Sequence, residues 1–343
     1  MRFVSVRNVL DLVADIGLEP MLIELAAYIE DDFARWLHFE KAPRYASHSP
    51  EGVIELMPTS DGAQFGFKYV NGHPANTQAG LQTVTAFGVL SDVRTGYPEL
   101  LAEMTIMTAL RTAATSAAVA RRLACPDSRT MAIIGLGAQS EFQAHAFKAI
   151  LSIDALRVFD VDPAATRKFI DNMGDSGLDI TICRSVEAAV LGADIITTIT
   201  ADKQHAVVLS DNLVGAGVHI NAVGGDCPGK TELHPDILVR ADVFVEFERQ
   251  TRHEGEIQQM PADFPVTEIW EVIADRKPGR TSARQITIFD SVGFAMEDFS
   301  ALRFLRDKVA GGRFCSSLDL LASPADPRDL FGLLKPERRR RAA

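Results

Sequence analysis

The chain has 343 residues and a formal net charge of −11 at pH 7. This length suffices for two domains with separate cores, and the acidic balance excludes the basic face that nucleic-acid binding requires. The four cysteines lack the spacing of metal ligands or of a disulfide framework, which predicts reduced thiols and no metal. The sequence contains neither a signal pattern nor an apolar run of membrane-spanning length, so we expect a cytoplasmic protein without a membrane partner.

The first part of the chain mixes helical and strand-like patterns. Residues 10–39 are rich in helical periodicity, whereas residues 53–58, 64–70 and 82–92 indicate strands interrupted by Gly, Pro and Asn. Residues 99–124, dense in Ala and Thr, predict one long helix. At the other end of the chain, the basic run at 338–341 indicates a solvated tail.

From Thr130 onward, predicted strands and helices alternate. Such alternation is typical of a doubly wound parallel sheet with helices on both faces. The segment 251–282 is richer in charge, Pro and Gly, and we expect it to elaborate the end of the sheet. The predicted strands of this region are residues 131–134, 155–160, 180–183, 195–200, 219–223, 243–246 and 286–290.

A Gly-x-Gly turn indicates a nucleotide site. The apolar run 131–134 leads into Gly135 and Gly137, and a helix is predicted from Glu141 onward, so backbone N–H groups at the helix start can approach a pyrophosphate. Asp160 ends the next predicted strand, where a carboxylate accepts hydrogen bonds from ribose hydroxyls and repels a 2′-phosphate. The third glycine position is Ser140, so the motif is incomplete. The pattern predicts NAD rather than NADP as the cofactor.

Four charged residues lie in or beside apolar surroundings: Arg44, Glu55, Lys68 and Arg111. A buried guanidinium needs an anionic partner, because an unpaired buried charge costs several kcal/mol. For Arg111, spacing favours an internal carboxylate as that partner, and a small anionic substrate is the alternative.

The passage 221–230 follows a predicted strand and holds Gly224, Gly225 and Asp226. In an open α/β sheet, ligands bind beyond the carboxyl ends of the strands. Asp226 is therefore a candidate to take a proton from an amine. A turn aspartate that caps nearby N–H groups explains the spacing equally well.

Several segments resemble the ornithine cyclodeaminase/μ-crystallin family, and the likeness runs from about Leu12 to Leu330. The most specific is Gly-Gly-Asp-Cys-Pro-Gly-Lys-Thr-Glu-Leu-His at 224–234, which is far longer than a generic fingerprint. The others are residues 44–48, 53–58, 67–77, 137–143, 254–259 and 289–294, together with 221–223 before the long motif.

The resemblance implies a role for each candidate residue. Arg44, Lys68 and Arg111 would hold a substrate α-carboxylate, Asp226 would be the catalytic acid/base, and Glu55 would lie near the substrate side chain. The implied cofactor-binding set is Thr83, Arg111, Gly135, Gly137, Ala138, Gln139, Asp160, Thr200, Val223, Gly224, Gly225, Asp226, Lys230 and Ser291.

The resemblance also implies a fold and an activity. The expected architecture is α/β, with a Rossmann-type NAD-binding domain over residues 116–311 and a discontinuous α+β domain, residues 1–115 and 312–343, that binds substrate and forms a homodimer. The implied reaction converts L-ornithine to L-proline and ammonia, with NAD removing and returning one hydride.

Three alternatives remain open at this stage. A lysine cyclodeaminase would form L-pipecolate with the same residues, and an amino-acid dehydrogenase or ketimine reductase would consume free NAD(P)H. A non-catalytic nucleotide-binding protein of the crystallin type is the third. Asp226 and Lys68 together count against this last alternative, because a pure binder needs no acid/base beside the nicotinamide.

Overall fold

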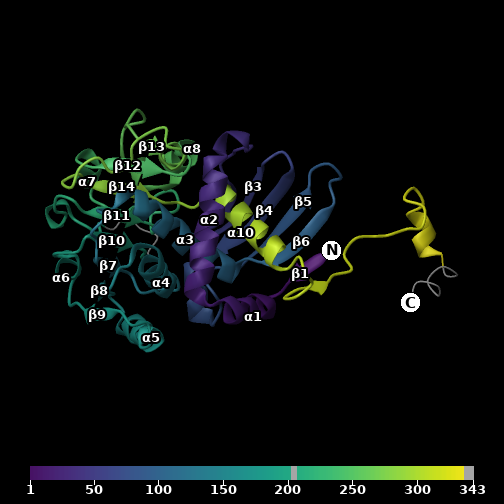
Figure 1. The fold of residues 1–343 in the computed structure, drawn as a ribbon, viewed down its shortest axis with the longest axis horizontal. Helices are drawn as coiled ribbons and strands as arrows, with labels where there is room; N and C mark the ends of the chain where they lie inside the picture. The colour runs from purple at the N-terminus through teal and green to yellow at the C-terminus, as the bar shows by residue number, and fades with distance from the viewer. Residues whose placement is uncertain (202–206, 336–343) are drawn as a thin grey trace.

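The computed structural model describes residues 1–201 and 207–335, so the basic run 338–341 lies outside the described residues. Two sheets stand side by side with helices between them (Figure 1). The helices are α1 (Val6–Ile16), α2 (Leu18–Ala34), α3 (Thr105–Leu123), α4 (Ser140–Leu151), α5 (Pro163–Met173), α6 (Val186–Val190), α7 (Pro235–Val239), α8 (Glu248–Glu254), α9 (Ile269–Ile273) and α10 (Ala295–Lys308). Short 3₁₀ turns are η1 (Trp36–His38), η2 (Pro74–Ala79), η3 (Asp211–Leu213), η4 (Glu256–Gln259) and η5 (Phe331–Leu334).

The second sheet, here called sheet B, is the predicted doubly wound parallel sheet. All of its strand pairs are parallel. In spatial order its strands are β13 (Thr267–Glu268), β12 (Asp242–Val245), β14 (Thr287–Asp290), β11 (His219–Ala222), β10 (Ile195–Thr198), β7 (Thr130–Ile134), β8 (Ala155–Phe159) and β9 (Asp179–Ile182). The seven strands predicted from the alternation are confirmed to within two residues at each end. The strand order reverses direction between β7 and β10, and this switch point is where ligands bind in such sheets.

The first sheet, here called sheet A, is mixed. In spatial order it consists of β15 (Ser316–Ser317), β1 (Arg2–Val4), β6 (Pro98–Glu103), β5 (Ala86–Asp92), β4 (Gln64–Gly72), β3 (Val53–Ser60) and β2 (Tyr45–His48). The pair β1–β6 is parallel and the other pairs are antiparallel. Since β15 joins β1 at the sheet edge, the first strand pairs with a strand from the C-terminal part of the chain.

The predicted helix over residues 99–124 is wrong at its start. Residues Pro98–Glu103 form β6, in which Leu100 and Ala102 are buried between neighbouring strands, and α3 begins only at Thr105. The Glu103 carboxylate accepts a hydrogen bond from the N–H of Ile106 at 3.0 Å, which satisfies a donor at the helix start. Composition favoured a helix here, but a place between β5 and β1 made the segment a strand.

Helix α3 lies between the two sheets. It packs against α2 and α4 and against β5 on one side and β11 and β14 on the other, and Ala113, Ala114 and Ala117 are fully buried in it. Such small side chains let the neighbouring elements come close to its backbone.

Helix α10 belongs with sheet A, because it packs on β3, β4, β5 and β6 and on α2. We therefore propose that the second domain boundary lies near Gly293 rather than at residue 311.

Candidate active site

The glycine turn after β7 touches the loop after β10, across the switch point of sheet B. Gly135 has φ +99°, and a Cβ there would stand 2.8 Å from the Ile199 carbonyl oxygen, so only glycine fits. A Cβ at Gly137 would meet no atom within 4 Å, and the residue is exposed with Ala138. The turn thus presents open backbone at the start of α4, as a bound pyrophosphate needs.

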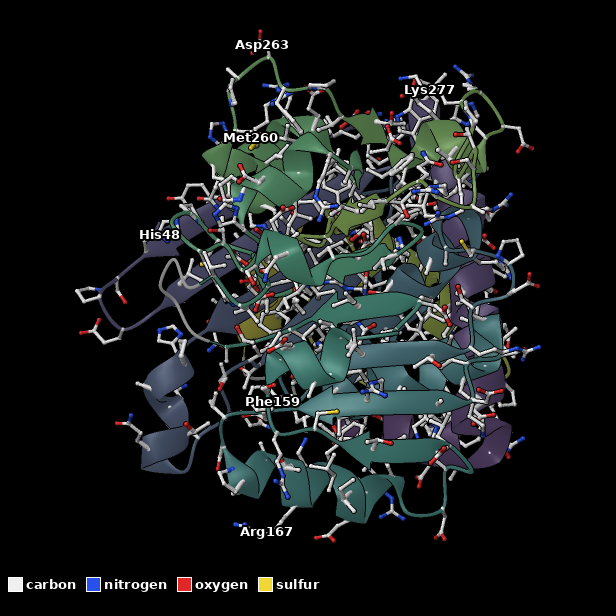
Figure 2. All side chains as sticks on the ribbon, turned by 90° about the vertical axis from the view of Figure 1, so that its left-hand side faces the viewer. His48, Phe159, Arg167, Met260, Asp263 and Lys277 are labelled. Carbon is white, nitrogen blue, oxygen red and sulfur yellow. The ribbon has the colours of Figure 1, made fainter. Side chains whose placement is uncertain are left out.

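Asp160 follows directly after β8, whose last residue, Phe159, is labelled at the ends of the sheet B strands in Figure 2. Its Oδ2 accepts a hydrogen bond from the N–H of Leu136 at 2.6 Å, so the carboxylate is tied to the glycine turn. In the same turn, the buried Oε1 of Gln139 has no hydrogen-bond partner in the described parts of the chain. These groups fit a dinucleotide. The open backbone suits the pyrophosphate, the Asp160 carboxylate suits the ribose hydroxyls, and the unpaired Gln139 oxygen suits an amide donor.

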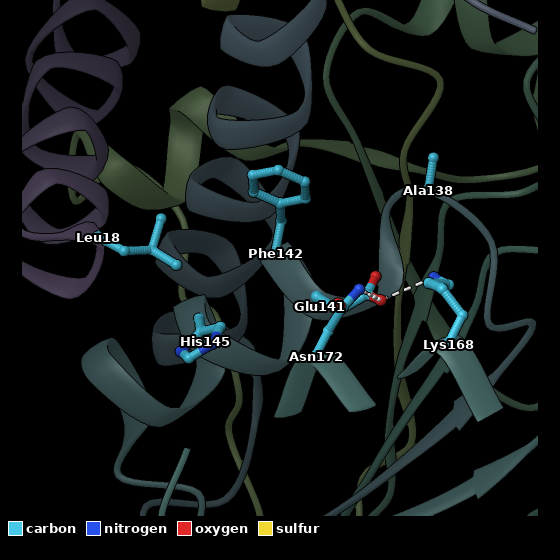
Figure 3. A pocket seen from close by; sticks show the side chains of 7 residues that line it. All are labelled: Leu18, Ala138, Glu141, Phe142, His145, Lys168 and Asn172. Carbon is cyan, nitrogen blue, oxygen red and sulfur yellow. Dashed lines mark hydrogen bonds and ion pairs between the residues drawn. The ribbon is translucent and has the colours of Figure 1, made fainter. Parts of the chain in front are cut away.

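A cavity of about 390 Å³ lies beside this turn, between α2, α4 and α5 (Figure 3). Lys168 in α5 places its Nζ 2.7 Å from Glu141 Oε1 and 2.9 Å from the carbonyl oxygen of Gly137. Asn172 donates to the same Glu141 oxygen at 2.9 Å. These contacts hold α5 against the turn and pair the carboxylate in the first turn of α4 with a cation. The residues that line the cavity therefore support the nucleotide turn.

Arg44 lies at the junction of the two sheets, with its side chain 6% exposed. Its Nη1 is 3.1 Å from Glu55 Oε2 in β3, and its Nε is 3.1 Å from Glu254 Oε2 at the end of α8. Its Nη2 donates to the carbonyl oxygens of residues 292 and 293, at 2.6 and 2.7 Å, in the loop after β14. The guanidinium thus joins sheet A to the carboxyl edge of sheet B.

Lys68 and Arg111 share one carboxylate deeper in the same region. Lys68 Nζ and Arg111 Nε lie 2.8 and 2.9 Å from Asp298 Oδ1 in α10, and Arg111 Nη1 lies 2.5 Å from Glu297 Oε2. The internal carboxylate partner that spacing favoured for Arg111 is therefore present. Burial lowers the pKa of Lys68 to about 8, helped by the positive charges of Arg111 and Arg44, because a buried group disfavours its charged form.

Asp226 follows β11, as expected, and its side chain is 55% exposed. Its Oδ1 is 3.5 Å from Lys230 Nζ, which in turn donates to the carbonyl oxygen of Thr200 at 2.8 Å. Within the described residues, Asp226 makes this hydrogen bond and caps no backbone N–H of its own turn. The carboxylate is thus presented to the crevice, close enough for its charge to raise the pKa of both Arg44 and Glu254.

The two glycines before Asp226 leave room for buried carboxylates that lie beneath the loop. A Cβ at Gly224 would collide with the carboxylate of Glu232, and one at Gly225 would stand 2.6 Å from Glu256 Oε1. These two acids, with Asp290 at the end of β14, form a relay in which each carboxylate accepts from the backbone of the next segment.

In this relay, Asp290 accepts from the N–H groups of Glu256 and Ile257 at 2.8 and 3.0 Å. Glu256 accepts from the N–H of Glu232 at 2.7 Å, and Glu232 accepts from the N–H of Thr200 at 2.8 Å. Burial raises the pKa of all three acids, that of Asp290 to about 7. The relay fixes the loops after β10 and β11, together with η4, relative to the end of β14.

The chain is similar to known proteins over nearly its whole length. The model of the ornithine cyclodeaminase/mu-crystallin family matches residues 6–313. The chain belongs to this family. An ornithine cyclodeaminase of Brucella suis biovar 1 (strain 1330) is 67% identical over 332 residues, which are 97% of this chain and 93% of that protein.

Two solved structures have a similar fold. A lysine cyclodeaminase, studied for recognition of L-lysine, L-ornithine and L-2,4-diaminobutyric acid, is similar with a TM-score of 0.88 and 31% identity, over 96% of this chain and 98% of that one. An archaeal alanine dehydrogenase dimer with bound NAD has a TM-score of 0.85 and 30% identity, over 94% and 99%.

Three further residues belong to the implied cofactor-binding set: Val223, Ser291 and Thr83. Ser291 donates to Glu246 at 2.8 Å and Val223 donates to the carbonyl of Thr198 at 3.0 Å, both at the carboxyl edge of sheet B. Thr83 lies on the connection between β4 and β5, where its carbonyl accepts from the N–H of His73 at 2.8 Å. In the described residues, the hydrogen bonds of Thr83 do not reach the other members of the set.

Glu254 is a site residue that sequence reasoning missed. Burial raises its pKa to about 7, against the lowering effect of Arg44 and with a further rise from Glu55. The signal was available, because Glu254 begins one of the segments that resemble the family, but only the fold brings it to Arg44. Among residues 1–201 and 207–335, no helix is long and apolar enough to cross a membrane, and no group of His, Cys, Asp or Glu is suited to hold a metal.

Proposed function

We propose that the protein converts L-ornithine to L-proline and ammonia with NAD as its cofactor. The observation that carries the proposal is the pattern of charge at the junction of the two sheets. The cations are Arg44, Lys68 and Arg111, and three carboxylates, those of Glu55, Glu254 and Asp226, lie on the side of Arg44. Ornithine carries one carboxylate and two ammonium groups, so a diamino acid matches both halves of this pattern.

The cationic half would bind the substrate carboxylate. Arg44 and Arg111 offer planar guanidinium groups, and Arg44 is held in place by two backbone carbonyls. Fixing the carboxylate fixes the α-carbon next to it, and such orientation can lower a barrier by roughly 7–11 kcal/mol in favourable cases.

The acidic half would accept protons from the two amino groups of the substrate. When bound, NAD supplies the removal and return of a hydride at the α-carbon. Asp226, exposed to the crevice, accepts a proton from the α-amine. Loss of the hydride and of this proton turns the α-amine into an imine. Glu254, buried beside Arg44, accepts a proton from the side-chain ammonium, which leaves a neutral amine able to attack the imine carbon and close the ring. The bond from the α-carbon to its original nitrogen then breaks, ammonia leaves with the protons held by the two acids, and return of the hydride to the cyclic imine gives proline.

Lysine is the strongest rival substrate, since it differs by one methylene, and such a difference is worth only about 1–3 kcal/mol in a pocket. Ornithine is favoured because the relative named for it is 67% identical, against 31% for the lysine cyclodeaminase structure. A dehydrogenase acting on alanine is disfavoured, because the relative named for that activity is 34% identical, against 67% for the ornithine cyclodeaminase.

We also propose a homodimer formed through the outward face of sheet A. This face is rich in exposed apolar side chains, which monomeric proteins seldom gather in one patch. Exposed fractions on it are 71% for Tyr45, 40% for Ile54, 41% for Leu56, 39% for Phe65 and 43% for Phe87.

We place the protein in the cytoplasm, which suits four cysteines that form no disulfide in the described part of the chain.

The test is incubation of the purified protein with NAD and either ornithine or lysine, scored for proline, pipecolate and ammonia. Ornithine deuterated at the α-carbon should give proline that keeps the deuterium there, with no accumulation of NADH absorbance, because the same hydride returns. Stoichiometric NADH release would refute the cyclodeaminase reaction in favour of a dehydrogenase, and pipecolate as the preferred product would reassign the substrate.

A further inference from the structure

The C-terminal end of the described chain is an arm that leaves the body of the molecule, defined here as residues 319–335. Leu318 still donates to the carbonyl of Met1 at 2.9 Å, and the chain then runs away from both sheets to end in η5 (Figure 1). The hydrogen bonds of η5 are internal, such as Gly332 N–H to Asp329 and Leu333 N–H to Leu330, each 3.2 Å. The family match ends at residue 313, before the arm begins.

The arm carries apolar side chains that its own chain leaves in solvent. In η5 and next to it, Leu330 is 60% exposed, Phe331 70% and Leu334 63%, and Leu320 near the start of the arm is 62% exposed. Pro324 and Pro327 separate the two apolar groups and keep the linker between them extended. A short apolar turn at the end of an extended linker is the form of an exchanged arm rather than of a solvated tail.

An apolar groove that matches the apolar side chains of the arm lies on the outward side of sheet A. It is a groove of about 590 Å³ whose apolar lining is formed mainly by Phe3, Val6, Phe87 and Leu101. Val6 is 51% exposed and Phe87 43%, and Phe87 belongs to the apolar face through which we propose dimerisation. The groove is thus continuous with that face.

The direction of the chain indicates whose groove the arm fills. Strand β15 is antiparallel to β1, with Ser316 opposite Phe3 and Ser317 opposite Arg2, so the chain passes Met1 and moves away from Val6. To reach its own groove the arm would have to reverse at the point where it leaves the sheet. The thirteen residues between β15 and η5 can span up to roughly 45 Å when extended, which is ample to cross a dimer interface.

We propose that η5 of one chain docks into the groove lined by Phe3, Val6, Phe87 and Leu101 of a second copy, so that the two copies exchange arms. The occupant is therefore this chain itself, and twofold symmetry makes the exchange reciprocal. The inference rests on the proposed homodimer and adds to it the contact that locks the two copies together.

The first experiment weakens the arm. Phe331→Asp with Leu334→Asp should raise the dimer dissociation constant, measured by sedimentation, by at least about 100-fold, since each copy loses two buried apolar anchors. The matched control is Leu191→Asp, an equally exposed leucine (72%) after α6, which should leave the dimer unchanged. An unchanged dimer in the arm variant overturns the arm exchange alone, whereas a monomeric unmodified protein overturns the proposed dimer and the exchange with it.

The second experiment identifies the groove. A chain with Val6→Cys is co-expressed with a chain with Leu334→Cys, the mixture is oxidised mildly, and covalent dimers are scored on a non-reducing gel. Exchange predicts a covalent dimer that contains one chain of each kind, and little in either variant alone. A single chain that carries both Val6→Cys and Leu334→Cys should also form a covalent dimer, because each arm reaches the groove of the other copy. If this double variant instead forms an internal disulfide and stays a monomer, or if no disulfide forms in any sample, the proposal is overturned.

Discussion

Gly224→Ala tests whether the buried carboxylate relay holds the active-site loop. The new Cβ would overlap the carboxylate of Glu232, which is buried with 1% exposure. That carboxylate accepts hydrogen bonds from the N–H and the hydroxyl of Thr200, the former at 2.8 Å. The methyl group can be accommodated only if both bonds break.

Two hydrogen bonds to a charged acceptor are worth about 1.5–3 kcal/mol each, so we expect a loss of about 3–6 kcal/mol in the free energy of unfolding. At about 2 °C per kcal/mol for larger domains, the melting temperature should fall by roughly 6–12 °C. Glu232→Ala should cost a similar amount, because it removes the same bonds.

The decisive measurement is a double-mutant cycle by chemical denaturation. Once Glu232 is shortened to alanine, the methyl group at position 224 has room, so the double variant should be about as stable as Glu232→Ala alone. Gly311→Ala is the control, because a Cβ there meets nothing within 4 Å, and it should change stability by less than about 1 kcal/mol. Additive losses in the double variant would refute the clash as the cause.

Three further outcomes are expected. Asp226→Asn should lower kcat by about 10²–10⁴-fold with almost no change in melting temperature, since this exposed side chain bonds only Lys230 in the described residues; full activity would mean that Asp226 is not the acid/base. The unmodified protein should bind NAD more tightly than NADP, and Asp160→Ala should reduce that preference in binding titrations, whereas equal affinities before mutation would contradict the role of Asp160. Because burial raises the pKa of Glu254 to about 7, its carboxylate ionises as pH rises, so kcat/KM should rise with pH through about 7 and Glu254→Gln should remove that rise; an identical pH profile in the variant would exclude Glu254 as the proton acceptor.

The local parts of the fold and site could be predicted from the sequence, because their causes lie within a few residues. Gly135 permits one tight turn, Asp160 ends one strand, and an apolar run bounded by glycine predicts β7 whatever lies around it. The long motif around Asp226 likewise placed a carboxylate beyond a strand end. The family and its cofactor followed from such segments.

The tertiary structure alone decided which charges meet. Arg111 pairs with Asp298 at a separation of 187 residues, Lys68 with the same acid at 230, and Arg44 with Glu254 across both sheets. No local periodicity encodes such pairs, because they form only when α10 packs on sheet A and α8 follows β12. Residues 98–103 form a strand for the same reason. Strands β5 and β1 lie on either side of them, and this position in the sheet outweighs the helix preference that the composition of residues 99–124 indicated.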